Sequence, residues 1–448
     1  MRIAYLTAGA AGMYCGSCMH DNALARSLQR KGVDCVLLPI YTPIRTDEQD
    51  VSSEQLFFGG INLFLLEELP VFRWVPPAIR RWLDSPRLLK WVSGRAAQPS
   101  DKMLGRLTVS MLRGLDGPQA SEAKRLANWL REELQPEVVL LSNFLIGGVL
   151  PAIRQSLPDA SLVVTLQGDD IFIDYLKSPY REQVIEEMKR LVPIVDRFIV
   201  HSQFYADKMS AMLDIPQEKI GLLPLAIDVQ HYADSRSHRQ GADDGTLSEA
   251  ENQAKEKWID IGFLARLAPE KGLHHLVAAF LEMLDSDAHL PVRLHVAGWQ
   301  GPQHDSYVKE LQQQLEQAGA GDRFHFHGSP DLAGKKRFLE QLDILSVPTD
   351  YADPKGLFVL EAWAVGLPVV QPSHGAFSEL LAKGQGGLLF PPGDVPALVA
   401  QLRRLASSAE ERDRLGVAGR AYVIEQGSIE YQATELLKLL EASKSRAT

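Results

Sequence analysis

The sequence predicts an α/β protein of two doubly wound domains, each with a parallel sheet between layers of helices. Short apolar runs of strand length alternate with helical patterns, stop over residues 233–257, and restart in the second half. Such alternation is typical of parallel sheets covered by helices on both faces. At 448 residues the chain is also too long for one ordinary core, so two domains are expected.

In the first half, five apolar runs have the length of strands. They are residues 2–8, 33–40, 137–143, 161–167 and 197–202. Residues 19–32 show helical apolar spacing and end on Gly32, which suits a helix C-terminus. We expect residues 1–225 to form an N-terminal Rossmann-like domain.

The second half repeats the pattern after a polar linker or surface insertion at 226–257. Its strand-length runs are residues 258–267, 292–299, 323–328, 342–349 and 367–372. We expect a second Rossmann-like domain over 258–427 and a C-terminal helix within 428–448 that packs on either domain. Doubly wound domains bind ligands at the carboxyl ends of their strands, so a central cleft between the domains is expected.

Composition excludes several classes of protein. The net charge of −10 argues against a general nucleic-acid binder, so no nucleic-acid partner is expected. The chain enters a strand pattern at once, without the features of a signal peptide, and its longest apolar stretch is interrupted by polar residues, glycine and proline. These features predict a cytoplasmic protein.

Residues 71–113 depart from the acidic average. They hold nine Lys or Arg against Asp84 and Asp101, with Trp74, Trp82 and Trp91 interleaved. This basic-aromatic insertion suits peripheral contact with an anionic membrane surface, at the inner membrane. A solvated helical cover whose tryptophans pack inward is the simpler explanation, because such faces are common in proteins.

Three cysteines cannot form a disulfide framework. Cys15 and Cys18 form a lone CxxC with His20 nearby, which allows a zinc site, a redox pair, or two small residues packed in a tight loop. Packing is the simplest of the three. Cys35 lies in a strand-like run and is predicted to be a core residue.

Two segments of the second half combine charge with helix starts. Arg266 leaves a strand and Lys271 stands where a helix begins, which suits a phosphate or diphosphate. An ion pair with Glu270 or another acid would explain Lys271 about as well. Asp353 precedes a proline that keeps it out of the helix that follows, and Glu361 lies about one turn inside that helix.

The start of the helix that contains Glu361 offers hydrogen-bond donors beside hydrogen-bond acceptors. The amides of Gly356, Leu357 and Phe358 open the helix and can bind an anion, and glycine lets a ligand approach the backbone. A carboxylate at Glu361 can accept from neighbouring sugar hydroxyls. A capping Asp and a helix-dipole Glu would explain each acid separately.

These residues carry a resemblance. The second half resembles family 4 of the retaining glycosyltransferases, which have the GT-B fold. That family's pattern is an arginine, a lysine-glycine five residues later, and a loop and helix with two glutamates eight positions apart. Arg266, Lys271 with its following glycine, and Glu361 match the pattern. The resemblance covers most of 258–425 and extends more weakly to the first domain.

The resemblance implies a nucleotide sugar held mainly by the second domain. Arg266 and Lys271 would neutralise the diphosphate as the glycosidic bond breaks, and Glu361 would bind the ribose. Backbone groups around Gly328 would lie near the base. The acceptor, a glycan, glycolipid or small molecule, would pass Gly9 to Gly12 of the first domain. Family members generally need no metal, so no cofactor and no metal ligands are expected.

This chain departs from the family at several positions. Asp353 stands where the first glutamate contacts the donor sugar and is one methylene shorter. Lys355 replaces an apolar residue, and it either favours an anionic sugar or faces solvent. Gln167 replaces a histidine and can only hydrogen-bond a sugar hydroxyl. Asp169 and Asp170 resemble a metal-binding pair, although a loop cap or acceptor contact explains them too.

The sequence therefore predicts a retaining glycosyltransferase of hexosyltransferase type. It would move a sugar from a UDP- or GDP-sugar to an acceptor hydroxyl, in glycan or glycolipid synthesis. The alternatives are an epimerase or phosphorylase-like enzyme of the same architecture, or a non-catalytic nucleotide-sugar-binding protein. Arg266→Ala and Lys271→Ala are both predicted to abolish transfer and to leave the fold intact.

Overall fold

The structure, a computed structural model, describes residues 1–9, 16–44, 49–53, 101–233, 258–287 and 290–444. The chain divides into two compact units, Met1–Pro224 with Ile429–Thr448, and Leu225–Ser428. Within the described residues, each unit contains one parallel six-stranded sheet with flanking helices. The predicted α/β class with two doubly wound domains is confirmed.

The sheet of the first unit has the strand order β2-β1-β3-β4-β5-β6. Its strands are β1 (Arg2–Thr7), β2 (Asp34–Pro39), β3 (Val138–Leu141), β4 (Ser161–Thr165), β5 (Arg197–Val200) and β6 (Ile220–Leu222). Its described helices are α1 (Gly16–Arg30), α5 (Asp101–Arg113), α6 (Ala120–Trp129), α7 (Leu150–Ser156), α8 (Asp169–Tyr175), α9 (Tyr180–Leu191), α10 (Gln203–Leu213) and α20 (Ile429–Lys444). The strand order reverses between β1 and β3, and such a reversal opens a ligand crevice at the carboxyl ends of the two strands.

The sheet of the second unit has the order β12-β11-β10-β7-β8-β9. Its strands are β7 (Ile259–Leu264), β8 (Val292–Ala297), β9 (Phe324–Phe326), β10 (Ile344–Ser346), β11 (Val369–Pro372) and β12 (Gly387–Phe390). Its helices are α13 (Leu273–Ser286), α14 (Asp305–Gln317), α15 (Leu332–Glu340), α16 (Leu357–Ala364), α17 (Phe377–Gly384), α18 (Val395–Ser407) and α19 (Ala409–Glu425). Here the order reverses between β7 and β10.

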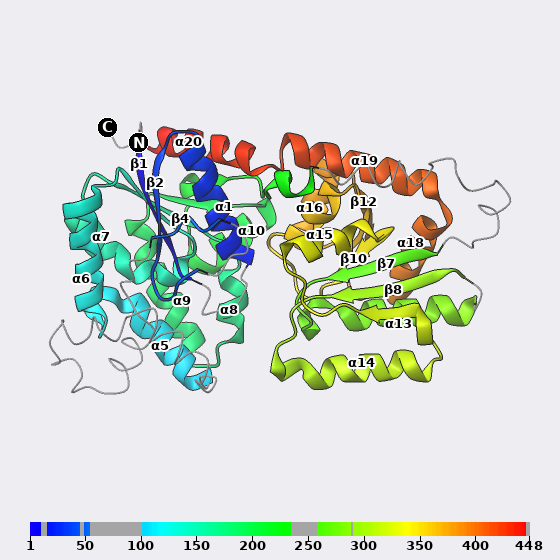
Figure 1. Cartoon of the computed structure of the whole chain (residues 1–448). Coiled ribbons are helices and arrows are strands. Elements are labelled where there is room, and N and C mark those ends of the chain that lie inside the picture. The colour runs from blue at the N-terminus through cyan, green and yellow to red at the C-terminus, as the bar shows by residue number, and fades with distance from the viewer. Residues whose placement is uncertain (10–15, 45–48, 54–100, 234–257, 288–289, 445–448) are drawn as a thin grey trace. The chain divides into compact units, whose positions relative to one another are not determined.

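The helices of the second unit cover both faces of its sheet. In Figure 1, α13 and α14 lie on one side of β7 and β8, and α15 and α16 lie on the other. This placement follows from the right-handed crossover of parallel strands, because the chain leaves β7 in one direction along the sheet and returns to β10 in the other. Strands covered on both faces must be apolar throughout, and β10 is buried at every position.

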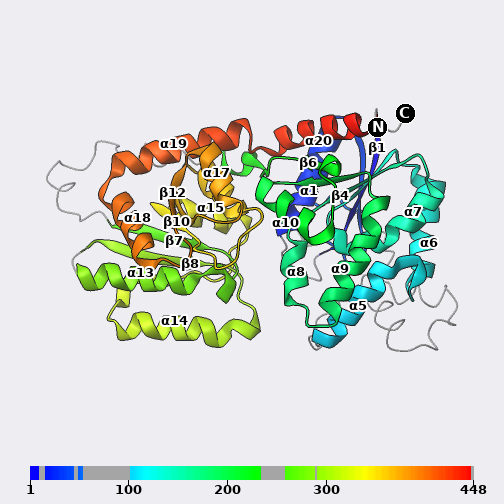
Figure 2. The ribbon, with the colours of Figure 1, turned by 180° about the vertical axis from the view of Figure 1, so that it is seen from behind.

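Two short edge strands, β6 and β12, were not among the predicted strands. Each is only three or four residues long and partly exposed, so the apolar signal in the sequence is weak. The helix α20 packs beside α1 in the first unit, where the Gln432 side chain contacts His20 at 2.7 Å (Figure 2). The described residues 226–233 of the predicted linker belong to the second unit, as does Leu225, the last residue of the predicted N-terminal domain. Leu225, Ile227 and Tyr232 join the core of that unit.

Several predicted features are only partly described. Residues 71–100 of the basic-aromatic insertion, Cys15, and 234–257 of the linker lie outside the described residues. Cys18 is buried inside α1, so this half of the CxxC lies in a helix rather than in a loop. Cys35 is a core residue of β2, as predicted, and burial raises the pKa of its thiol to about 12.

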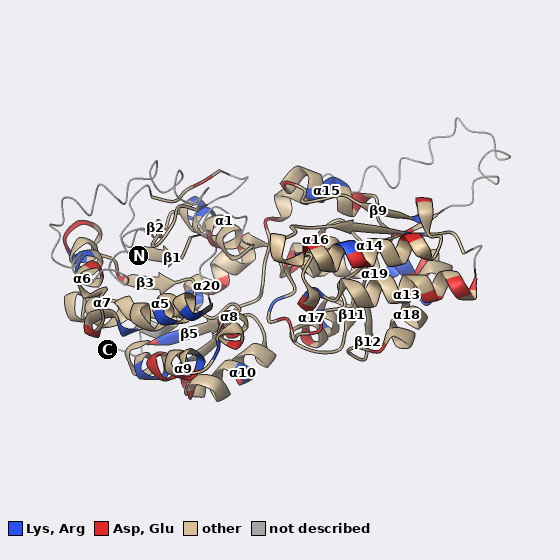
Figure 3. Cartoon of the chain, turned by 90° about the horizontal axis from the view of Figure 1, so that it is seen from below, with Lys and Arg blue, Asp and Glu red and all other residues tan. Residues whose placement is uncertain are grey.

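Two surface properties follow from the fold. Acidic and basic residues are interspersed along the helices of each unit in Figure 3. At the described end of the basic-aromatic insertion, Arg113 forms an ion pair with Glu187 at 3.0 Å, so part of that basic charge is balanced within the protein. Among the described residues, no helix combines the length and the apolar character needed to cross a bilayer.

Candidate active site

The turn between β7 and α13 carries two cations. Lys271 ends a short 3-10 turn, and Gly272 caps α13 in a left-handed conformation with φ of 74°. A Cβ atom at Gly272 would lie 1.8 Å from the Pro348 carbonyl oxygen, so only glycine lets the segment after β10 pack against this turn. That close approach brings Lys271 to the loop that follows β10.

The loop after β10 supplies the partners of Lys271. Its ammonium lies 2.9 Å from Asp353 Oδ2 and donates to the Tyr351 hydroxyl at 2.5 Å, and that hydroxyl donates to Asp353 Oδ2 at 2.8 Å. The three side chains form a closed triangle that is largely buried. Since an ammonium has three N–H donors, this arrangement accounts for two of those on Lys271.

Asp353 is charged despite its burial. Burial alone would raise the pKa of this carboxyl, which is 5% exposed, but the Lys271 ammonium and the bonds from the Lys355 amide and Tyr351 hold it well below its usual range. Burial and the neighbouring Asp353 charge raise the pKa of Tyr351 well above its usual range, so the phenol stays protonated and can donate. The triangle therefore carries one positive and one negative charge.

Arg266 lies on the exposed side of the same turn. Its guanidinium is half exposed and lies 3.2 Å from the Glu270 carboxylate. The sequence allowed Lys271 an ion pair with Glu270 or with another acid. In the structure, Lys271 pairs with Asp353, and Glu270 pairs with Arg266. An exposed pair of this kind is weak and can exchange for an anionic ligand.

The start of α16 differs in one respect from the prediction. Gly356 caps the helix with φ of 75°, and Leu357 and Phe358 begin it, as predicted. The Gly356 amide, however, donates to Asp353 Oδ1 at 3.0 Å. Asp353 therefore already binds one of the three amides predicted to bind a ligand anion. Glycine is required at position 356 by the positive φ and by the close approach of the Phe377 ring.

Glu361 lies in the second turn of α16, as the spacing predicted. Its carboxylate forms an ion pair with Lys335 of α15 at 2.5 Å, and both side chains are mostly buried. Lys335 was not anticipated from the sequence, because nothing in a lysine-rich helix indicates which lysine faces the next helix. Gly328, which follows β9, has φ of 69° and open space around its Cα, and its carbonyl accepts from the Gly298 amide.

These second-unit residues come from neighbouring strands. Arg266 and Lys271 follow β7, Asp353 precedes α16 after β10, and β7 and β10 are paired at the reversal of strand order. A doubly wound sheet binds ligands at such a reversal, outside the carboxyl ends of its strands. Lys271 and Asp353 are in direct contact, while Glu361 belongs to a separate ion pair.

Gln167 lies in the first unit, after β4. Its side-chain amide donates to the Ser142 carbonyl at 2.6 Å and to the buried carboxylate of Asp21 at 3.3 Å. Asp21 also accepts from the hydroxyls of Tyr5 and Thr7. This polar network orients Gln167 at the carboxyl end of β4, beside the reversal between β1 and β3. Gly12 lies outside the described residues.

Asp169 and Asp170 hold the loop after β4. Asp169 accepts from the amides of Phe144 and Gln167, and burial raises its pKa to about 6 despite these bonds. Asp170 pairs with Lys208 at 2.5 Å and accepts from the Tyr205 hydroxyl at 2.7 Å. These contacts match the loop-cap explanation of the acid pair, and contact with an acceptor stays a prediction.

Comparisons with known proteins agree with this architecture. Residues 105–231 match the family described as Glycosyltransferase Family 4, and residues 246–422 match the family described as Glycosyl transferases group 1. The chain is 25% identical over 244 residues to D-inositol 3-phosphate glycosyltransferase of Streptomyces griseus, covering 52% of this chain and 51% of that relative. The chain spans about half the length of such curated relatives.

Solved structures resemble the whole chain. Sucrose-phosphate synthase from Thermosynechococcus elongatus superposes with a TM-score of 0.67 at 16% identity, covering 99% of each chain. The Anabaena protein HepE, solved in complex with UDP, gives a TM-score of 0.65 at 16% identity, covering 99% of this chain and 100% of that one. At this identity the likeness establishes the fold, which is that of GT-B glycosyltransferases.

Proposed function

The chain belongs to the glycosyltransferases that join a Family 4 domain to a group 1 domain, and from this membership we propose that it transfers a sugar from a nucleotide diphosphate to an acceptor hydroxyl. The donor would be a UDP- or GDP-sugar, and the anomeric configuration would be retained. The observation that carries the proposal is the Lys271, Tyr351 and Asp353 triangle beside Arg266, at the strand reversal of the group 1 domain.

Two cations suit the departing diphosphate. Lys271 has one N–H beyond those bound to Tyr351 and Asp353, and it can donate that hydrogen to a phosphate oxygen. Arg266 can exchange its exposed contact with Glu270 for a bidentate contact with phosphate. Negative charge on the diphosphate grows as the glycosidic bond breaks, so cations placed in advance stabilise the transition state more than the ground state.

The carboxylates have different tasks in this proposal. Glu361 binds the ribose hydroxyls, and Lys335 holds its carboxylate in place. Asp353 keeps the Lys271 ammonium charged and fixes its orientation. The side chain of Asp353 is shorter than that of a glutamate and leaves more room for the donor sugar. Because Asp353 stays ionised and fully hydrogen-bonded, it is a positioning group for the cation rather than a proton acceptor.

The acceptor proton then goes to the departing phosphate. In front-face transfer the acceptor hydroxyl approaches on the side that the diphosphate leaves, and a phosphate oxygen takes its proton. This route needs no side-chain base, which is consistent with an amide at Gln167. Relatives named for colanic acid and amylovoran biosynthesis support an acceptor in glycan synthesis.

The first experiment is a binding screen. Thermal-shift measurements with UDP, GDP, ADP and their sugar conjugates should give a rise in Tm with one nucleotide series, because a ligand of the folded state stabilises it. HepE was solved with UDP and with UDP-glucose, which supports testing the uridine series first. A chain stabilised by none of these nucleotides would contradict a nucleotide-sugar donor.

The second experiment separates transfer from its alternatives. The stabilising donor is incubated with a panel of sugar, glycolipid and small-molecule acceptors, and products are followed by NMR. A product with the donor's anomeric configuration, together with slow donor hydrolysis when no acceptor is present, supports retaining transfer. An isomerised donor would indicate an epimerase, and tight nucleotide binding without turnover on any acceptor would indicate a binding protein.

A further inference from the structure

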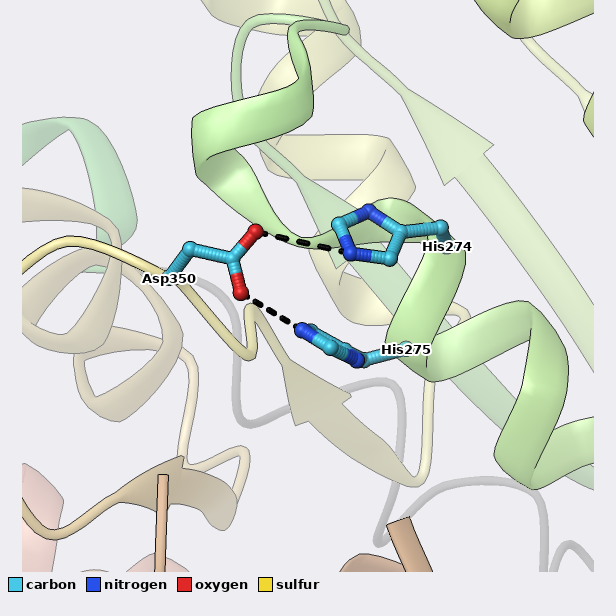
Figure 4. Close-up of side chains that lie close together, drawn as sticks. All are labelled: His274, His275 and Asp350. Carbon is cyan, nitrogen blue, oxygen red and sulfur yellow. Dashed lines mark hydrogen bonds and ion pairs between the residues drawn. The ribbon is translucent and has the colours of Figure 1, made fainter. Parts of the chain in front are cut away.

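Three side chains with metal-binding atoms meet at the N-terminal end of α13. His274 and His275 begin that helix, and Asp350 lies in the loop after β10 (Figure 4). The Nε2 atom of His275 is 2.6 Å from Asp350 Oδ1, and the Nε2 atom of His274 is 3.4 Å from Asp350 Oδ2. Both rings therefore face the same carboxylate, although the two residues are adjacent in the chain.

The spacing of these atoms fits one metal ion. Ligand atoms from the three residues all lie within 4.8 Å of one another. Bond lengths of about 2.0–2.2 Å in a tetrahedral site place neighbouring ligand atoms roughly 3.3 Å apart. The His274 contact is already at that separation, and the His275 contact needs to open by less than about 1 Å, which a rotation of the exposed Asp350 side chain can supply.

The surroundings of the rings favour binding. The Nδ1 atom of His274 lies 3.0 Å from the Tyr307 hydroxyl, and such a contact to the second nitrogen is what commonly orients a metal-bound imidazole. Asp350 is about half exposed, so an ion can enter from water and keep a water ligand.

We propose that His274, His275 and Asp350 bind one divalent transition-metal ion of the Zn²⁺ class. Two imidazoles and one carboxylate suit Zn²⁺, Co²⁺ or Ni²⁺, whereas Mg²⁺ and Ca²⁺ require oxygen ligands. This site goes beyond the absence of metal ligands expected from the sequence. It does not depend on glycosyl transfer, since the metal would bind whatever reaction the chain performs.

The ion would join the two segments that carry the cation triangle. His274 follows Lys271 by three residues, and Asp350 precedes Asp353 by three. The segments already touch where the Asp350 amide donates to the Glu270 carbonyl at 3.1 Å. A metal bridge at this point fixes the loop after β10 against the start of α13, so we expect it to stabilise the second unit.

A second histidine cluster provides a matched control. His295 of β8, His325 of β9 and His327 just after β9 lie close together, with ring centroids 5.1–6.4 Å apart. The nearby Asp260 carboxylate is occupied by Arg293, which holds both of its oxygens at 2.7 and 2.9 Å. A cation at this position is repelled by the guanidinium, so His325→Ala should leave metal binding unchanged.

The test is a titration of the metal-free full-length chain with Co²⁺ and Zn²⁺. Calorimetry and the visible absorption of Co²⁺ should report one equivalent bound by the wild type, and Zn²⁺ should raise the Tm while Mg²⁺ should not. His275→Ala and Asp350→Asn should each weaken binding at least tenfold. Both side chains are at the surface, and circular dichroism checks that the variants are folded.

Other outcomes would overturn the proposal. Wild-type affinity in both His275→Ala and Asp350→Asn would place the ion elsewhere, and a thiolate-to-cobalt charge-transfer band lost in Cys18→Ser would place it at the CxxC segment. Loss of binding in His325→Ala would place it at the second histidine cluster. No saturable binding of Co²⁺ or Zn²⁺ to the wild type would refute the site altogether.

Discussion

Replacing Lys271 by alanine removes the cation beside a buried carboxylate. Asp353 is 5% exposed and would keep the hydroxyl of Tyr351 and the amides of Lys355 and Gly356 as donors, but no counter-charge in contact. Breaking a buried ion pair from one side costs about 3–5 kcal/mol, because the remaining charge has left water without compensation. The expectation from sequence that this variant keeps its fold therefore needs one addition, because the folded second unit should be markedly less stable.

The cost converts into a measurable shift in Tm. For a unit of this size, about 1 kcal/mol shifts Tm by 2–4 °C, so Lys271→Ala should lower the Tm of the second unit by about 6–20 °C. Arg266→Ala is the matched control. Its half-exposed ion pair with Glu270 contributes about 1 kcal/mol or less, so its Tm should change by a few degrees at most.

The loss of stability in Lys271→Ala should also depend on pH. In the wild type, the folded pKa of Asp353 lies below its unfolded value of about 3.9, so its contribution is present above that pH and is lost as the pH falls further. Without Lys271, burial raises the folded pKa above the unfolded value. The variant then loses stability as the pH rises through that raised pKa, and its deficit is larger at pH 7 than at pH 4.

Differential scanning calorimetry at the two pH values tests this reasoning. The double variant Lys271→Ala with Asp353→Asn removes the uncompensated charge, so it should be more stable at pH 7 than Lys271→Ala alone. If Lys271→Ala melts within about 2 °C of the wild type at pH 7, or if its deficit is the same at both pH values, the buried ion pair does not stabilise the unit in the way described.

Three further predictions concern other charged side chains of the two units. Arg266→Ala should lower kcat at least tenfold in a transfer assay while its Tm changes by a few degrees at most, and wild-type kcat would remove Arg266 from the diphosphate site. Glu361→Ala should weaken nucleotide binding, measured by calorimetry, about tenfold to a hundredfold, because hydrogen bonds to a charged group contribute about 1.5–3 kcal/mol. Lys335→Ala should weaken nucleotide binding less than tenfold, because Lys335 only positions the Glu361 carboxylate. Equal effects of these two variants would contradict that division of roles. Asp170→Ala should lower the free energy of unfolding of the first unit by about 1–3 kcal/mol, because the buried Tyr205 hydroxyl loses its acceptor. If Mg²⁺ stabilises the wild type but not this variant, a metal-binding role of Asp170 is favoured instead.

The fold was largely predictable because it depends on local patterns. Strand-length apolar runs separated by helical spacing predicted ten of the strands, and the weak, partly exposed runs of β6 and β12 escaped notice. Motif spacing also placed Arg266, Lys271 and Glu361 correctly relative to their helices. Local spacing works for these residues because a turn or a helix start fixes the position of a side chain a few residues away.

The pairing of charges was not predictable in the same way. The sequence suggested Glu270 or another acid as the partner of Lys271 without deciding between them. The structure pairs Lys271 with Asp353 and Glu270 with Arg266. Tyr351 and Lys335 were missed for a similar reason, since neither has a pattern that distinguishes it from a surface residue. Two adjacent histidines were visible in the sequence, but their shared carboxylate lies 75 residues away.

The sequence by itself determined the α/β class, the two domains and the family, because periodicity and motif spacing are properties of the local chain. The tertiary structure alone decided which groups meet: the close approach permitted by Gly272 brings the loop after β10 onto the turn before α13. That one contact places Asp353 on Lys271 and Asp350 beside the two histidines. Partners between two strand ends depend on the order of strands in the sheet, which no short stretch of sequence encodes.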